Sequence, residues 1–171
     1  MRATNLHVVR PLNEGDLELL LLWRNNPSVR SYMYTQHEIS VEEHKRWFKQ
    51  ESQNPQKYLL VFEINRSPLG FINIHELRKG GSAEWGFYTA PNAPKGTGRA
   101  LGISALRYAF ETIKLHKICG KALAFNKSSI RFHLSLGFQQ EGVLRQQQFD
   151  GKEYHDVYCF GLLANDWLQA N

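Results

Sequence analysis

The stretch "PKGTGRALGISALRYAF", residues 94–110, combines a glycine-rich turn with an amphipathic helix. Gly96 and Gly98 leave the backbone bare, Ala100 keeps the first helical turn small, and Lys95 and Arg99 add positive charge. The first turn of a helix exposes unpaired amide groups and a partial positive charge, which together bind phosphate. Glycines before a helix also occur in simple turns, but the two cations favour a diphosphate site.

The spacing of this loop differs from the two common phosphate-binding motifs. Position 101 is leucine, so the third glycine of Gly-x-Gly-x-x-Gly is missing. No Gly-Lys-Ser/Thr closes a P-loop either. Neither a dinucleotide-binding nor a P-loop enzyme is therefore indicated.

Strands and helices alternate around the loop. Strands are expected at residues 5–12, 57–64, 68–77, 80–91, 116–125, 138–149 and 154–163, and helices after Asp16, from Pro27, after Ser40, from Gly98 to about Lys114 and over 126–137. The central strand–helix–strand–helix portion requires parallel pairing, whereas the hairpins imply antiparallel neighbours. The sequence thus predicts an α/β fold with a mixed, twisted sheet of about seven strands and helices on both faces.

Size and composition fit one soluble domain over residues 1–171. The net charge of +5 suits an anionic partner, but no run of five cations occurs, so nucleic acid is not favoured. No apolar run approaches the length of a membrane span or secretory signal, which predicts a cytoplasmic protein. Cys119 and Cys159 are expected to be buried free thiols, and the seven histidines lack metal-ligand spacing, so no metal is expected.

A second motif, "NKSSIRFHLSLGF" at residues 126–138, lies downstream of the loop. With Thr97-Gly98-Arg99-Ala100, it resembles the two coenzyme motifs of the GNAT superfamily of acetyl-CoA-dependent N-acetyltransferases. Lys95 stands where that family has arginine or glutamine, and His133 stands at its tyrosine position. The resemblance implies a GNAT fold and acetyl-CoA as co-substrate. It assigns the following residues to the coenzyme: Phe87, Tyr88, Lys95, Gly96, Thr97, Gly98, Arg99, Ala100, Asn126, Ser129 and His133.

Acetyl transfer to an amine requires a neutral amine, a stabilised oxyanion and a thiolate that is protonated or tolerated. By family position, His133 is a candidate proton donor to the thiolate, with simple packing as the alternative. Glu84 is the leading candidate base, and Glu76 and His44 are further candidates that act directly or through water.

The N-terminal half resembles the PseH-type subgroup, which acetylates UDP-4-amino-4,6-dideoxy-N-acetyl-altrosamine in pseudaminic acid synthesis and flagellin glycosylation. The resemblance rests on "WRNNPSVR", "MYTQHEIS" and the Glu43–Trp47 segment. It predicts a nucleotide-sugar acceptor, with an apolar wall around the 6-methyl group and cations at the diphosphate. The predicted acceptor residues are Arg24, Met33, Tyr34, His44, Trp47, Glu84 and Tyr88, with Arg30 and Lys79 as further cations.

Other functions remain open at this level. A ribosomal-protein or other protein N-terminal acetyltransferase would share the coenzyme motifs, and an antibiotic or polyamine acetyltransferase would favour an acidic pocket. A non-catalytic acyl-CoA sensor is also compatible with the motifs. The sequence leaves the oligomeric state open, with a homodimer as one option.

Overall fold

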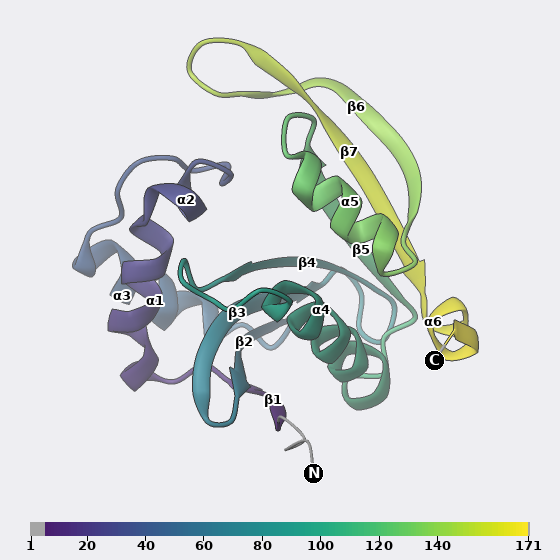
Figure 1. Cartoon of the computed structure of the whole chain (residues 1–171), viewed down its shortest axis with the longest axis horizontal. Coiled ribbons are helices and arrows are strands. Elements are labelled where there is room, and N and C mark those ends of the chain that lie inside the picture. Colours follow the sequence, from purple (N-terminus) through teal and green to yellow (C-terminus); the bar gives the residue numbers. More distant parts are fainter. Residues whose placement is uncertain (1–5, 171) are drawn as a thin grey trace.

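Seven strands form one mixed sheet in the order β1-β2-β3-β4-β5-β7-β6 (Figure 1). The computed structural model describes residues 6–170, so Asn5, where the first strand was expected to begin, lies outside the described residues. The strands are β1 His7–Pro11, β2 Lys57–Ile64, β3 Ser67–Glu76, β4 Ser82–Thr89, β5 Lys117–Leu123, β6 Gln139–Phe149 and β7 Tyr154–Leu163. Only β4 and β5 pair in parallel among these strands. The expected mixed sheet is confirmed.

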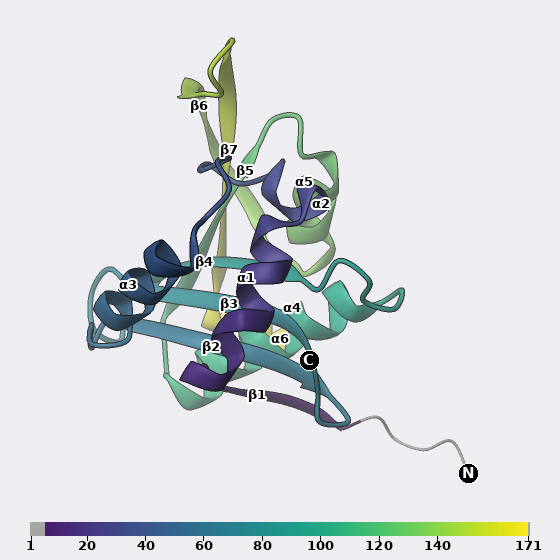
Figure 2. The same cartoon turned by 90° about the vertical axis from the view of Figure 1, so that its left-hand side faces the viewer.

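Helices cover both faces of the sheet. They are α1 Leu17–Asn25, α2 Pro27–Arg30, α3 Val41–Glu51, α4 Thr97–Arg107, α5 Lys127–Ser135 and α6 Ala164–Ala170. Figure 2 shows α1 and α3 on one face of β2–β4 and α4 behind it. Within residues 6–170, none of the helices has the length and apolarity needed to cross a membrane.

Strand alternation divides the core into two layers. Leu60 and Phe62 of β2 point into the cluster beneath α4, whereas Leu59 and Val61 point into the cluster beneath α1 and α3. The helix α4 packs very closely, because a Cβ built on Gly70 would lie 2.3 Å from Leu101 Cδ1. Only a residue without a side chain fits there.

Several helix boundaries differ from the expected ones. The long helix leaves α-geometry at residue 107 and continues as a π-helical turn, Tyr108–Thr112, before Lys114 adopts a left-handed φ of 64°. The helix expected after Ser40 is α3, which Ser40 caps by accepting the Glu43 amide, while the Glu43 carboxylate contacts His37. The C-terminal helix α6 was not expected.

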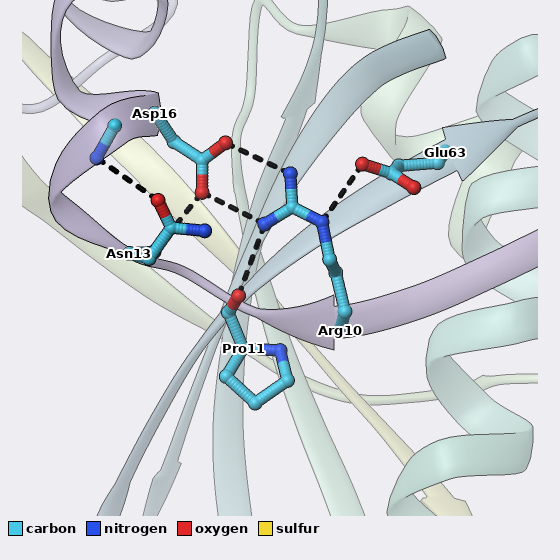
Figure 3. Close-up of polar contacts among 6 residues, drawn as sticks. Arg10, Pro11, Asn13, Asp16 and Glu63 are labelled. Carbon is cyan, nitrogen blue, oxygen red and sulfur yellow. Dashed lines mark hydrogen bonds and ion pairs between the residues drawn. The ribbon is translucent and has the colours of Figure 1, made fainter. Parts of the chain in front are cut away.

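Asp16 does not cap α1 with its side chain but takes part in a small ionic network (Figure 3). Arg10 donates through Nη1 and Nη2 to the Asp16 carboxylate at 2.8 Å and through Nε to Glu63 at 2.7 Å. Asp16 also accepts the Asn13 amide at 3.0 Å. The hydrogen bond from Arg10 is the largest cause that lowers the pKa of Asp16. The network ties β1 to β2 and to the start of α1.

Replacement of Asp16 by asparagine should lower the free energy of unfolding at pH 7 by about 2 kcal/mol, because a nearly buried charged hydrogen-bond partner is lost. The pKa of Asp16 is lowered in the folded state, so its contribution is fully present above the ordinary value of about 4 and is lost as the pH falls below it. Urea unfolding at pH 7 and pH 3 measures this difference. Glu14→Gln, at an exposed position in the same turn, is the control. An equal loss of stability at both pH values would contradict the assignment.

Candidate active site

The parallel strands β4 and β5 separate after three paired positions. The pairing runs from Ser82 with Lys117 to Glu84 with Cys119, although β4 continues to Thr89 and β5 to Leu123. A cavity of about 590 Å³ opens where the strands diverge. The segment around α2 and the N-terminal part of α5 complete its wall.

Nine of the residues predicted from the sequence line this cavity. They are Met33, Tyr34, Glu84, Phe87, Tyr88, Gly98, Asn126, Ser129 and His133. The structure therefore brings together most of the side chains that the two coenzyme motifs and the strand "SAEWGFY" supply. It also adds residues that the sequence reasoning missed, among them Tyr32, Cys119 and Lys121.

The glycine-rich loop has the geometry of an open helix start. Gly96 is the N-cap of α4 with a left-handed φ of 93°, which favours glycine, and a Cβ on Gly98 would meet nothing within 4 Å. The amides of Gly98 and Arg99 precede the first helical hydrogen bond, which Ala100 makes to the Gly96 carbonyl. Lys95 is exposed beside them. These groups fit a bound diphosphate.

Thr97 does not fit its expected place among the coenzyme ligands. Its side chain is buried, its hydroxyl donates to the Pro94 carbonyl at 2.7 Å, and its amide bonds to the same carbonyl at 3.1 Å. Both groups are used to close the turn. Thr97 therefore shapes the loop and has no donor left for a phosphate.

The hydrogen bonds of His133 contradict its expected role as proton donor. The indole Nε1 of Trp85 donates to His133 Nε2 at 3.1 Å, and His133 Nδ1 lies 2.8 Å from the Ser129 carbonyl. An indole nitrogen only donates and a carbonyl only accepts, so the proton must be on Nδ1 and the ring is neutral. Burial also lowers the pKa of His133. Its ring stacks on Phe160 at 4.9 Å, so the packing alternative describes this residue better.

Glu84, the leading candidate base, lies in the cavity wall in an ion pair. Its Oε1 is 2.7 Å from Lys121 Nζ on β5, and both side chains are a little over 40% exposed, at 42% and 43%. The hydrogen bond that Lys121 donates to Glu84 raises the pKa of Lys121. Lys121 lies two residues beyond Cys119, so strand alternation predicts that both side chains point to the same face. The partner of Lys121, in contrast, follows only from the pairing register of β4 with β5.

Glu76, the second candidate base, does not line the cavity. Its buried carboxylate accepts the Tyr58 hydroxyl at 2.7 Å and the Gly80 amide at 2.8 Å. The first of these bonds raises the pKa of Tyr58 to about 12. Glu76 therefore braces the β3–β4 turn, where Lys79 also lies, and the structure does not support either residue at the active site.

Arg24, His44 and Trp47 lie near Tyr88, on the face of β4 that α1 and α3 cover. A series of ring contacts runs from His44 to Trp47, from Trp47 to Phe71 and from Phe71 to Tyr88, with centroids 5.1, 5.9 and 5.4 Å apart. Trp47 packs against the core beneath α1 and α3 and is absent from the cavity wall. The structure therefore does not support its expected contact with a sugar.

Three buried side-chain atoms of the described residues have no hydrogen-bond partner: Arg24 Nη1, His44 Nε2 and Asn73 Oδ1. Burial lowers the pKa of Arg24 and of His44, and Arg24 contributes to the shift of His44. Arg24 Nη2 is held by the Thr35 carbonyl at 2.7 Å. Unpaired buried polar atoms are uncommon and indicate a place for a ligand group or water.

The cysteines and one carboxylate cluster differ from expectation. Cys119 and Cys159 are free, as predicted, but both are half-buried, and Cys119 lines the cavity. Asp150, Glu153 and His155 offer ligand atoms within 4.8 Å of one another at the β6–β7 turn. Asp150 already accepts the amides of Lys152 and Glu153 and contacts His155 at 2.7 Å, which accounts for the cluster as hairpin-turn structure.

Replacement of Gly98 by valine should weaken acetyl-CoA binding at least about tenfold and leave thermal stability nearly unchanged. The new side chain meets no protein atom but fills the space in front of the exposed amides. Isothermal titration with acetyl-CoA and thermal unfolding measure both effects. Gly142→Val on β6 is the matched control, since a Cβ there also meets nothing within 4 Å. Unchanged affinity of Gly98→Val would exclude this loop as the coenzyme site.

Replacement of Gly120 by alanine should disrupt the packing of Trp85 and His133 in the cavity wall. A Cβ at this position would lie 2.3 Å from His133 Nε2 and 2.9 Å from Trp85 Nε1, so the hydrogen-bonded pair must separate. We expect about 1–3 kcal/mol lower stability and weaker acetyl-CoA binding. Gly86→Ala, where a Cβ has open space, is the stability control. If Gly120→Ala kept both properties, the close packing of Trp85 and His133 would be refuted.

Residues 7–139 match the family model described as "Acetyltransferase (GNAT) domain". The acetyltransferase PseH of Campylobacter jejuni (serotype O:23/36, strain 81-176) is 33% identical over 125 residues, which cover 71% of this chain and 76% of the relative. The spermidine N(1)-acetyltransferase of Vibrio cholerae is 28% identical over 166 residues, covering 95% of this chain and 96% of the relative. The crystal structure of V. cholerae spermidine N-acetyltransferase with CoA and spermine superposes with a TM-score of 0.87 at 27% identity, over 95% of this chain and 98% of that one. The chain therefore belongs to the GNAT acetyltransferase family and is an N-acetyltransferase that uses acetyl-CoA.

Proposed function

We propose that this enzyme transfers the acetyl group of acetyl-CoA to the 4-amino group of a UDP-linked 4-amino-4,6-dideoxy-N-acetyl hexose. Similarity to PseH over most of the chain and the cations on the acceptor side support the proposal. The product would be a 2,4-diacetamido sugar nucleotide, which fits a cytoplasmic step of pseudaminic acid synthesis.

The observation that carries the proposal is the unpaired guanidinium nitrogen of Arg24. Burial is the main cause that lowers the pKa of Arg24; Arg30 lowers it further and Glu43 opposes the shift, while the neutral hydroxyl of Tyr88 in the cavity wall also lies near the guanidinium. Arg30 lies 3.8 Å from the Glu38 carboxylate, so the unpaired Arg24 Nη1 and His44 Nε2 are the atoms on which the proposed diphosphate contact rests. A buried donor atom without a hydrogen-bond partner, such as Arg24 Nη1, is unfavourable, so an anionic ligand would gain from reaching it.

The cavity wall on the acceptor side also suits a deoxy sugar. Met33 and Tyr34 of the segment after α2 line it together with Val29 and the ring of Tyr88. These groups offer apolar surface to a methyl group and hydroxyls to the sugar ring. The expected contribution of Trp47 is not needed for this wall.

The chemistry requires few groups from the protein. The neutral amine attacks the thioester carbonyl. The nitrogen then loses one proton and the departing thiolate gains one, so the proton count balances. No residue has to supply a net proton, so the neutral His133 is compatible with turnover. Glu84, the carboxylate in the cavity wall, would accept the amine proton directly or through water, and amides of β4 beyond the paired region would stabilise the oxyanion.

Polyamine acetylation is the second candidate function. The full-length likeness to the Vibrio cholerae spermidine acetyltransferase favours it. Acetylation of ribosomal or other protein N-termini is a third possibility that shares the same coenzyme motifs. These functions differ in the charge of the acceptor, which is anionic for a nucleotide sugar and polycationic for spermidine.

CoA release with a UDP-4-amino-sugar, spermidine and an N-terminal peptide tests the proposal. We expect turnover mainly with the nucleotide sugar. Arg24→Met should raise KM for that substrate about 10- to 100-fold and leave acetyl-CoA affinity unchanged, because a charged contact to the diphosphate is lost. Arg46→Met, at an exposed position of α3, is the matched control. Turnover of spermidine or peptide without any of the nucleotide sugar would reject the proposed acceptor.

A further inference from the structure

The cavity contains one carboxylate, and that carboxylate is neutralised. Of the described side chains that line the cavity, only Glu84 and Lys121 carry a full charge, because the hydrogen bonds of His133 keep its ring neutral. The two charges lie 2.7 Å apart. The acceptor end of the cavity is therefore close to electrically neutral.

The ion pair spans the point where the sheet opens. Glu84 is the last residue of β4 paired with β5, and Lys121 lies two residues beyond its partner Cys119. Both side chains keep a little over 40% of their surface exposed, so a ligand in the cavity can reach them. An incoming amine thus meets a carboxylate that already has a cation at hydrogen-bond distance.

Other titratable groups face Lys121 from the elements around it. They are Tyr34 from the segment after α2, Glu84 from β4, Cys119 from β5 itself and Cys159 from β7. Lys121 pairs across the sheet with Cys159. Burial raises the pKa of Tyr34 and of Cys119, so both remain neutral near pH 7. Glu84 is then the group that balances the charge of Lys121.

We propose, resting on the acceptor proposed above, that Lys121 determines which amines the enzyme accepts by neutralising Glu84. A second ammonium group of a polyamine finds no free carboxylate in the cavity and is repelled by Lys121. The same positive charge disfavours the ammonium form of the acceptor amine, so more of the bound substrate is the neutral nucleophile. Lys121 is a specificity-determining and positioning residue and forms no bond to the reacting atoms.

The test compares Lys121→Met, which removes the charge, with Lys121→Arg, which keeps it. Steady-state kinetics with spermidine and with the UDP-4-amino-sugar give the ratio of their kcat/KM values. We expect Lys121→Met to shift this ratio toward spermidine by about tenfold, and Lys121→Arg to leave it within about twofold of the wild type. In Lys121→Met the acidic limb of the kcat profile for the preferred substrate should move to higher pH, because the ammonium form of the bound amine is favoured once the positive charge of Lys121 is gone.

The double variant Lys121→Met/Glu84→Gln provides the decisive control. It lacks both charges, so the gain for spermidine should disappear. An unchanged ratio and pH profile in a folded Lys121→Met protein would overturn the inference, as would an equal shift in Lys121→Arg. If Lys121→Met fails to fold, Lys121→Gln takes its place in the comparison. The change in ratio is measured against the wild type, so the two proposals can be told apart. A wild type that prefers spermidine would reject the proposed function. The variants would still decide the role of Lys121.

Discussion

The separation of β4 from β5 beyond Glu84 and Cys119 is the constraint on which the site depends. Two parallel strands would normally continue their ladder, but here the pair formed by Trp85 and His133 occupies the space next to β5. Gly120 allows this arrangement, since any Cβ would collide with both rings. This close packing lies beside the end of the ladder, and β4 has no β5 partner beyond Glu84.

Strand alternation then gives β4 two distinct faces. Trp85 and Phe87 pack with Phe132 of α5 in the cluster on the α4 side, where the coenzyme motifs lie. Tyr88 packs against Phe71 on the α1–α3 side, near Arg24. One face of β4 can therefore contact the coenzyme and the other face the acceptor. Residues from both faces line the cavity that opens where the pairing with β5 ends. This explains why an apolar core and two polar sites coexist in a chain of 171 residues.

The sequence was informative where one local rule determines the outcome. The glycines before α4, the Ser40 cap and the parallel pairing of β4 with β5 each follow from short-range geometry, and each is confirmed. Asn126 and Ser129 of the second coenzyme motif line the cavity, where Asn126 caps α5 by accepting the Ser129 amide.

Predictions failed where the polar atoms of a side chain bind a partner that the motif does not show, whether that partner is near or distant in the sequence. His133 was assigned a proton-donor role by motif position, but Trp85, 48 residues away, fixes its protonation. Thr97 and Glu76 have suitable chemistry but spend their polar atoms on nearby turns. The Lys121 pair could not be found either, because its partner depends on the register between two strands separated by a helix.

The global and local charges of this enzyme act at different stages of substrate selection. The net charge of +5 acts over about 8–10 Å at physiological salt, and it favours the approach of anions over polycations. Inside the cavity that long-range field matters less than the Glu84–Lys121 pair, whose charges are in direct contact. The nucleotide sugar proposed as acceptor would be attracted during approach and would meet no uncompensated carboxylate on arrival. A polycation would be repelled by the net charge during approach and would find no free carboxylate in the cavity. The net charge and the Glu84–Lys121 pair therefore both favour an anionic acceptor.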